Sequence, residues 1–353
     1  MKKQYIIPIF VPHLGCPNDC TFCNQRKISG QLKEITEEDV RKTIDYYLEN
    51  FEGEKVYKEI AFFGGSFTGI DVEKQNKLLS IANEYIKNKK VDGIRISTRP
   101  DYIDKPTLKR LKKYKVKTIE LGVQSTNDYI LNKCKRGHTF EDVKRASKLI
   151  RWYRFNLGHQ MMVGLPESTE SDDIKTAQDL IKLKPKMVRI YPVLVIRGTE
   201  LEREYKSGEY EPLTVEQAVE RCKTISLMFE KKKITVIRIG LQSTDTICSP
   251  ENDLSEVVAG PYHETFRQLV DSSIYYDRIV NKINRIATRV KEIEVKVNPQ
   301  NISNVVGYKK ENVNKLKEIY DLDLVVVQDE KMPLDKMHIR ASKKYKEFLD
   351  DKE

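Results

Sequence analysis

Long apolar runs are missing from this chain of 353 residues, of which 33% are charged. The longest apolar stretches are strand-sized, such as residues 324–327, and fall short of the roughly 18 residues that a membrane span needs. Pro8, Pro12 and His13 interrupt the N-terminal apolar stretch before it reaches the length of a signal peptide. The composition therefore predicts a protein without a membrane partner, and residues 5–11 are expected to form the first strand.

Cysteine is also scarce. There are six cysteines, three of which lie within eight residues, while the others are scattered. An even set of spaced cysteines, as in small secreted domains, is absent. We therefore expect a reducing compartment and a cytoplasmic protein.

Strand-like and helix-like segments alternate along most of the chain. Runs that are apolar on both faces, linked by helix-period segments, predict a parallel sheet, either open and doubly wound or closed toward a barrel. The rhythm changes after the polar, turn-rich residues 243–256. We predict one domain over residues 1–245 and a small C-terminal α/β domain over residues 246–353.

A short cysteine motif follows the first predicted strand. Cys16, Cys20 and Cys23 would lie at the C-terminal edge of a parallel sheet. Three thiolates can bind three irons of a 4Fe-4S cluster, and without a nearby fourth cysteine the fourth iron stays open for chemistry. The alternative from these residues alone is a structural zinc site with His13 as the fourth ligand.

The cysteine spacing, with Phe22 before the last cysteine, resembles the signature of the radical S-adenosylmethionine (radical SAM) superfamily. Four more segments match in order: FFGGSFTG (62–69), RISTRPDYI (95–103), IELGVQSTNDYILNKCKRGHT (119–139) and HQMMVGLPEST (159–169). Over residues 1–245 they resemble the catalytic subunit of Elongator and its bacterial relatives and, less closely, the oxygen-independent coproporphyrinogen oxidases. The resemblance implies an α/β fold, a partial (β/α)6 TIM-like barrel of parallel strands with a small C-terminal α/β domain.

The resemblance also implies two cofactors, a 4Fe-4S cluster on the three cysteines and S-adenosylmethionine. The expected S-adenosylmethionine contacts are the backbone of Gly64 and Gly65 at the amino group, Gln124 and Arg136 at the ribose and carboxylate, and the backbone near Met162 and Val163 at the adenine, with Ser66 as a further contact. Glycine is needed at the first of these because a Cβ would block close approach of the backbone.

Two positions depart from the family pattern. Ser97 stands where Elongator-type sequences usually carry Glu, and Gln160 stands where relatives often carry His or Asp. We still expect Ser97 to lie near the cofactor, with altered polar contacts to cofactor or substrate.

By this resemblance, the cluster would pass one electron to S-adenosylmethionine and yield a 5′-deoxyadenosyl radical that abstracts hydrogen from the substrate. A one-electron reductant such as flavodoxin or ferredoxin is then an expected partner. Elongator's acetyltransferase domain carries a glycine-rich loop, but after residue 245 this chain has only Gly260 and Gly307. Acetyl-CoA-dependent chemistry by this chain alone is therefore not expected.

Two aromatic residues were assigned by their position in the pattern. Tyr191 lies near the C-terminal end of a predicted strand, where barrel enzymes bind substrate, and is the candidate catalytic residue. Trp152 is expected in the core, because Val143, Ala146 and Ile150 define a buried side of its helix.

Positive charge is concentrated in one part of the chain. Residues 105–154 hold 15 basic and 4 acidic side chains, a local +11 that exceeds the +10 of the whole chain. On predicted helices 104–115 and 139–154 the basic side chains should face outward and form one surface for RNA phosphates. The candidate RNA-binding residues there are Lys109, Lys112, Lys113, Arg145 and Lys148.

Residues 304–319 resemble a KH-type RNA-binding helix-loop-helix with the second glycine of its GxxG loop missing. The loop is Gly307, Tyr308, Lys309 and Lys310, and the two lysines are further RNA-binding candidates. The alternative is a helix hairpin that covers the barrel.

Three hypotheses for function follow. The first is a radical SAM enzyme acting on RNA, foremost tRNA. The second is a radical enzyme acting on a small, tetrapyrrole-like molecule, and the third is a non-catalytic haem or cluster carrier.

Overall fold

The structure of the protein is a computed structural model, which describes residues 4–11, 16, 20–24, 35–51, 56–284 and 290–341. The chain forms two compact units, residues 1–264 and residues 265–353. His13, the alternative zinc ligand, lies outside the described residues.

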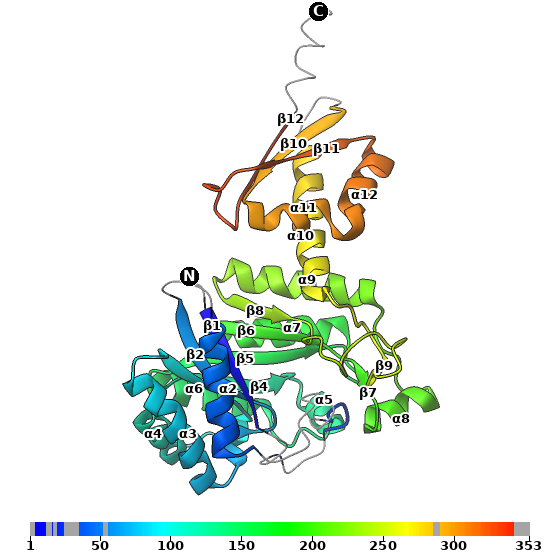
Figure 1. The fold of residues 1–353 in the computed structure, drawn as a ribbon. Coiled ribbons are helices and arrows are strands. Elements are labelled where there is room, and N and C mark those ends of the chain that lie inside the picture. The colour runs from blue at the N-terminus through cyan, green and yellow to red at the C-terminus, as the bar shows by residue number, and fades with distance from the viewer. Residues whose placement is uncertain are drawn as a thin grey trace, which may run out of the picture. The chain divides into compact units, whose positions relative to one another are not determined.

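The first unit contains a seven-stranded sheet in the order β1-β2-β3-β4-β5-β6-β8 (Figure 1). All neighbouring strands are parallel, and the sheet curls into a partial barrel with helical crossovers, as predicted. Its strands are β1 (Gln4–Phe10), β2 (Tyr57–Phe63), β3 (Gly93–Thr98), β4 (Val116–Gln124), β5 (Asn156–Val163), β6 (Met187–Pro192) and β8 (Thr235–Ile239).

Helices connect these strands. They are α2 (Glu37–Glu49), α3 (Val72–Lys87), α4 (Lys105–Lys113), α5 (Asp128–Lys133), α6 (Phe140–Trp152), α7 (Glu170–Lys182), α8 (Glu200–Ser207) and α9 (Val215–Lys231). Six helical connections thus join seven strands.

Local sequence signals define where several helices begin. Thr36, Thr139, Thr169 and Thr214 each form a reciprocal capping box with the residue three positions later. Such a box satisfies two backbone N–H groups that a helix start leaves without partners. The helix starts, which lie at the C-terminal edge of the sheet beside the site, are therefore fixed by local sequence.

The core between sheet and helices is apolar. Ile96 of β3, Ile119 of β4 and Val143, Ala146 and Ile150 of α6 are all 0% exposed. The prediction for Trp152 is wrong, because its side chain is 70% exposed and packs edge-on against Tyr153. Trp152 lies at the end of α6, beyond the residues that face the sheet.

A small ribbon joins residues 243–264 to the barrel unit. Strand β7 (Val195–Ile196) pairs antiparallel with β9 (Val257–Ala259). Ile247 and Val257 are buried in one cluster with Leu194 and Ile196. The two units consequently divide after Glu264, whereas the sequence pattern placed a boundary after residue 245.

The second unit has a three-stranded sheet in the order β11-β10-β12. Strands β10 (Glu292–Val297) and β11 (Asp323–Gln328) are parallel, and β12 (Met337–Ala341) is antiparallel to β10. Its helices are α10 (Phe266–Ile283), α11 (Ile302–Val306) and α12 (Glu311–Tyr320). A small α/β arrangement is thus present. Over the described ranges, none of the helices is long and apolar enough to span a bilayer.

Candidate functional site

The cysteine segment after β1 is held against two distant elements. The Cys23 N–H donates to the Cys20 carbonyl (2.9 Å), which closes a turn. The Thr21 N–H donates to the Cys134 carbonyl after α5 (3.2 Å), and the Leu201 N–H of α8 donates to the Thr21 carbonyl (2.8 Å). The segment is therefore fixed by backbone hydrogen bonds on both sides.

The thiols lie in apolar surroundings. Cys20 is 5% exposed and belongs to a buried cluster with Phe22, Leu165 and Val193, against which Cys23 and Met162 also pack. Burial raises the pKa of the Cys16 thiol, and the guanidinium of Arg136 opposes this shift. Thiolates in such surroundings are favoured by cations close to them.

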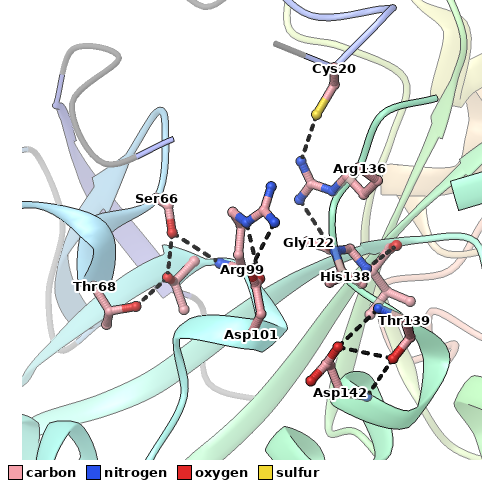
Figure 2. Close-up of polar contacts among 12 residues, drawn as sticks. Cys20, Ser66, Thr68, Arg99, Asp101, Gly122, Arg136, His138, Thr139 and Asp142 are labelled. Atoms are coloured by element: carbon pink, nitrogen blue, oxygen red, sulfur yellow. Dashed lines mark hydrogen bonds and ion pairs between the residues drawn. The ribbon is translucent and has the colours of Figure 1, made fainter. Parts of the chain in front are cut away.

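Arg136 links the cysteine segment to β4. Its Nη1 donates to Cys20 Sγ (3.4 Å) and its Nη2 to the Gly122 carbonyl (2.9 Å), as Figure 2 shows. A Cβ on residue 122 would lie 2.6 Å from Arg136 Nη2, so a side chain there would displace the guanidinium. The Nε of Arg136 is buried and has no hydrogen-bond partner within the described part of the chain.

The end of β4 is irregular at Gln124. The pairing of β4 with β5 shifts register between Gly122 and Gln124, and Gln124 adopts φ +71°. A non-glycine residue in this conformation is strained, and such strain is frequent at functional sites. The Oε1 of Gln124 is buried without a partner among the described residues.

The glycine-rich turn after β2 fits tightly against Val11, the residue that follows β1. Gly64 has φ +86°, and a Cβ on it would lie 2.5 Å from the Val11 carbonyl oxygen. Ser66 Oγ shares a hydrogen bond with Thr98 Oγ1 (2.8 Å) and accepts one from the Arg99 N–H (3.2 Å). The turn after β2 and the end of β3 are thereby fixed to each other.

Arg99, which the sequence reasoning missed, is a second buried guanidinium at this site. It is 2% exposed and binds Asp101 through Nε (3.0 Å) and Nη2 (2.8 Å). Its Nη1 is buried without a partner in the described structure. Figure 2 shows that Arg99 and Arg136 extend toward the side on which Cys20 lies.

His138 completes this group of polar side chains. Its Nε2 lies 3.2 Å from the Val123 carbonyl, and its Nδ1 has no partner in the described structure. Burial, reinforced by Arg136, lowers the pKa of His138 to about 3, so the ring is neutral. A neutral ring that donates from Nε2 leaves Nδ1 as an acceptor.

Four buried polar atoms near the cysteines have no partner among the described residues, and they fit a polar ligand. Buried polar groups are normally hydrogen-bonded, so each orphan suggests a missing partner. Within the described ranges, no group of three or more His, Cys, Asp or Glu side chains is close enough to hold a single metal ion. Thiolates of a 4Fe-4S cluster bind different irons, which is a different requirement from gathering around one ion. The four atoms are Arg99 Nη1, Gln124 Oε1, Arg136 Nε and His138 Nδ1.

The inward face of the barrel carries charge instead of the apolar residues expected from the sequence. Arg95, 1% exposed, donates to Glu59 Oε2 (2.8 Å) and Glu120 Oε1 (2.5 Å). Arg189 donates to Glu120 Oε2 (2.6 Å). Burial alone would raise the pKa of Glu120, but Arg189 and Arg95 lower it to about 2. Glu120 is therefore an anion that holds three strands together.

Three further predicted positions belong to this interior layer. Gln160 Nε2 donates to Glu120 Oε2 (3.0 Å) and to Ser97 Oγ (3.3 Å). Tyr191 pairs with Met162 in the register of β5 and β6, and burial raises the pKa of its phenol. Ser97 thus lies next to Gln160 and Tyr191 next to Met162, so the altered positions are linked to the site through the barrel interior.

The remaining candidates lie away from the cysteines. Lys112 Nζ donates to the Tyr153 carbonyl (2.9 Å), and Arg145 Nη1 donates to the Ile103 carbonyl (2.7 Å). These contacts place α4 and α6 side by side, as expected. The other RNA-binding candidates on these two helices are exposed, namely Lys109, Lys113 and Lys148. In the second unit, Lys309 and Lys310 are also exposed.

The sequence contained signals for the residues that were missed. Arg95 and Ser97 of β3 and Arg99 just after it alternate with Ile94, Ile96 and Thr98, which indicates one polar face. Arg99 directly follows that strand, at the edge where parallel sheets carry their sites. Reading the strand as apolar on both faces concealed this pattern.

Two family models match this chain. The model of the radical SAM superfamily matches residues 10–180, and the model of the Radical_SAM C-terminal domain matches residues 185–276. An uncharacterised protein of Methanocaldococcus jannaschii is 31% identical over 229 residues, which are 62% of this chain and 70% of that protein.

Two further proteins are similar to this chain. The tRNA uridine(34) acetyltransferase of M. jannaschii is 34% identical over 183 residues, which are 46% of this chain and 34% of the relative. The chain thus matches about a third of the length of that relative. The structure of the archaeal Elp3 of Methanocaldococcus infernus, with 24% identity, has the same fold over 81% of this chain and 64% of its own, with a TM-score of 0.60.

Proposed function

This chain belongs to the radical SAM superfamily, and from that premise we propose that it cleaves S-adenosylmethionine reductively in order to modify RNA, foremost tRNA. Membership makes it a radical SAM enzyme. The single observation that carries the proposal is Arg136, a buried guanidinium that contacts a motif cysteine and whose Nε has no hydrogen-bond partner among the described residues.

The proposed cluster ligands are Cys16, Cys20 and Cys23. When bound, the cluster would supply an electron to the sulfonium of S-adenosylmethionine, and the resulting 5′-deoxyadenosyl radical would abstract hydrogen from the substrate. Hydrogen bonds to a ligand sulfur tune the potential of such clusters, which gives the Arg136 contact to Cys20 a role. Phe22 and Leu165 pack around the cysteines and would exclude water.

The chain's own polar groups support a site for S-adenosylmethionine beside the cysteines. Gly64 lies so close to the Val11 carbonyl that a Cβ would clash, and Ser66 fixes that turn to β3. The backbone of Gly64 and Gly65 would receive the amino group. Arg136 Nε and Gln124 Oε1 would hold the carboxylate and ribose. The backbone near Met162 and Val163 would flank the adenine, with Tyr191 one strand away.

The proposal of an RNA substrate is supported by the relatives and by charge. The relatives include tRNA uridine(34) acetyltransferases, and α4 and α6 present adjoining basic faces. Lys112 and Arg145 bind backbone carbonyls, so a variant that removes only charge should use Lys109, Lys113 and Lys148. Changing these three to Gln should flatten the dependence of log K on log salt by about 2 to 3.

The loop of the second unit supports the same substrate class. Along the chain, helices α11 and α12 come between strands β10 and β11, which pair in parallel. The linker between the two helices contains Gly307, Lys309 and Lys310, all with positive φ. Lys309 and Lys310 are exposed and would contact phosphates. Gly307 packs against the start of α12, where a Cβ would lie 2.7 Å from the Asn312 nitrogen.

The six cysteines form no disulfide, which supports a reducing, cytoplasmic setting with a reductant such as flavodoxin or ferredoxin.

The test of the proposed function has two parts. Anaerobically reconstituted protein should release 5′-deoxyadenosine from S-adenosylmethionine when reduced. Mass spectrometry should then find an altered tRNA nucleoside in cells that lack the protein. Release of 5′-deoxyadenosine with unchanged nucleosides would refute RNA as the substrate and favour a small molecule.

A further inference from the structure

Five helix-to-strand turns gather at the edge of the sheet where the strands begin, opposite the candidate site. Because the strands are parallel, the turns that precede β3, β4, β5, β6 and β8 share this edge. We call these turns the floor. They are residues 87–92, 112–117, 151–155, 182–186 and 231–235.

Contacts join consecutive turns of the floor. A Cβ on Gly93 would lie 2.9 Å from the Lys117 side chain. The other links are hydrogen bonds: Lys112 Nζ to the Tyr153 carbonyl (2.9 Å), Arg151 Nη1 to the Leu183 carbonyl (3.4 Å) and the Thr235 N–H to the Lys186 carbonyl (3.2 Å). The floor is therefore one continuous surface.

The floor carries more net charge than the whole protein. Its five turns contain 15 Lys and Arg and one acidic residue, Asp92, giving +14 against +10 for the chain. All 15 basic residues are exposed. Among the described side chains, Lys182 is the one member that forms an ion pair, with Asp179. This charge is mostly uncompensated.

The backbone of each turn places a basic residue where glycine is usual. The second residue after each of these helices has a φ of 54° to 61°, the left-handed conformation that favours glycine. In any other residue this conformation is strained. The five residues are Lys89, Lys115, Arg154, Lys184 and Lys233.

The simplest alternative is that lysines merely complement helix dipoles. Helix ends elsewhere differ, however. The left-handed residue after α8 is Gly208, and the one after α12 is Asp321. Lys135, the left-handed residue after α5, is neutralised by Glu200 (2.6 Å). Exposed, unneutralised bases in the left-handed position thus recur at the floor.

Trp152 adds a stacking surface to these charges. It is the single tryptophan of the chain, is 70% exposed and lies in the turn between Arg151 and Arg154. Its neighbour Tyr153 holds Lys112 through the backbone. An exposed indole among cations matches the chemistry of nucleic acid. Its phosphates bind lysine and arginine side chains, and an unpaired nucleobase stacks on an aromatic ring.

We propose that the floor docks a folded RNA, with its lysines on phosphates and Trp152 stacked on an unpaired base. This rests on the proposed RNA substrate and deepens it. Helix α6 begins two residues after His138 at the candidate site, and its 13 residues span about 20 Å. The docked part of the RNA would therefore be remote from the reacting nucleotide, which requires a substrate tens of ångströms long.

The test uses the full chain and the fluorescence of Trp152, titrated with bulk tRNA at about 0.1 M salt. We expect saturable quenching. Changing Lys89, Lys115 and Lys184 to Gln should weaken binding roughly 10- to 100-fold and reduce the salt slope by about 2. Gln keeps the left-handed strain of Lys, so the change removes charge alone. The matched control changes the exposed helix residues Lys42, Lys77 and Lys206 to Gln and should bind like the parent.

The outcomes together distinguish the two proposals. If the parent binds no tRNA, both the RNA substrate and its docking on the floor are wrong. If the parent binds tRNA and the floor variant binds equally well, the floor proposal alone falls. Trp152→Ala should bind at least about fivefold more weakly in a filter assay, and equal binding would refute stacking. Stronger binding of phosphatidylglycerol vesicles than of tRNA at the same salt would overturn RNA as the occupant.

Discussion

Arg136→Ala tests the candidate site where its geometry is most specific. Two nitrogens of Arg136 are engaged by Cys20 Sγ and the Gly122 carbonyl, which leaves Nε for a ligand. A charge-assisted hydrogen bond contributes about 1.5 to 3 kcal/mol, so the affinity for S-adenosylmethionine should fall roughly 10- to 150-fold. The cluster should still assemble, because arginine is not one of its ligands.

The assay separates these two effects. Iron, sulfide and visible absorbance of anaerobically reconstituted protein report the cluster, and equilibrium dialysis reports S-adenosylmethionine affinity. Arg145→Ala is the matched control, since this arginine on α6 binds the Ile103 carbonyl and lies outside the site. Unchanged affinity in Arg136→Ala, with the cluster intact, would refute the assignment of Arg136 to the cofactor.

Three further predictions address the cysteines, the glycine turn and pH. Changing any one of the three motif cysteines to Ala should abolish the brown chromophore and S-adenosylmethionine cleavage; stoichiometric zinc in a colourless parent would contradict the cluster. Gly64→Ala should lower the free energy of unfolding by more than Gly208→Ala. The two glycines have similar φ angles, but a Cβ on Gly64 would lie 2.5 Å from the Val11 carbonyl oxygen, whereas a Cβ on Gly208 would meet none of the described atoms within 4 Å. Equal losses in urea unfolding would count against the close approach at Gly64. His159 is fully buried, and burial lowers its pKa to about 3, below the unfolded value of about 6.5. Acidification from pH 8 to pH 5.5 should therefore remove about 1.4 kcal/mol of stability through this residue. His159→Gln should lose correspondingly less stability on acidification, and identical pH profiles would show that folding does not lower the pKa of His159.

Local patterns in the sequence predicted the architecture. Alternating strand and helix periods predicted parallel strands with helical crossovers, and the structure confirms them. Thr139 and Asp142 form the capping box expected at the start of α6. These features were readable because strand faces, helix faces and caps depend on residues a few positions apart.

Predictions that depended on which side of a helix or strand packs against the rest of the fold were less successful. Trp152 was placed in the core, yet α6 ends with that side chain in solvent. The strands were read as apolar on both faces, yet Arg95 and Glu120 point into the barrel and neutralise each other there. Helix and strand periodicity identifies a face but not its neighbour, and a buried charge becomes acceptable only when a partner from another strand reaches it.

The sequence by itself determined the family resemblance, the cysteine motif and the order of strands and helices, because each is encoded in short spacings. Only the tertiary structure decided that Arg136 reaches Cys20, 116 residues away along the chain. It also decided that Arg99 Nη1 is buried at the same site without a partner among the described residues, and that five basic turns spread over residues 87–235 meet on one edge. Such contacts follow from the closure of a parallel sheet, which brings distant segments together at its two ends.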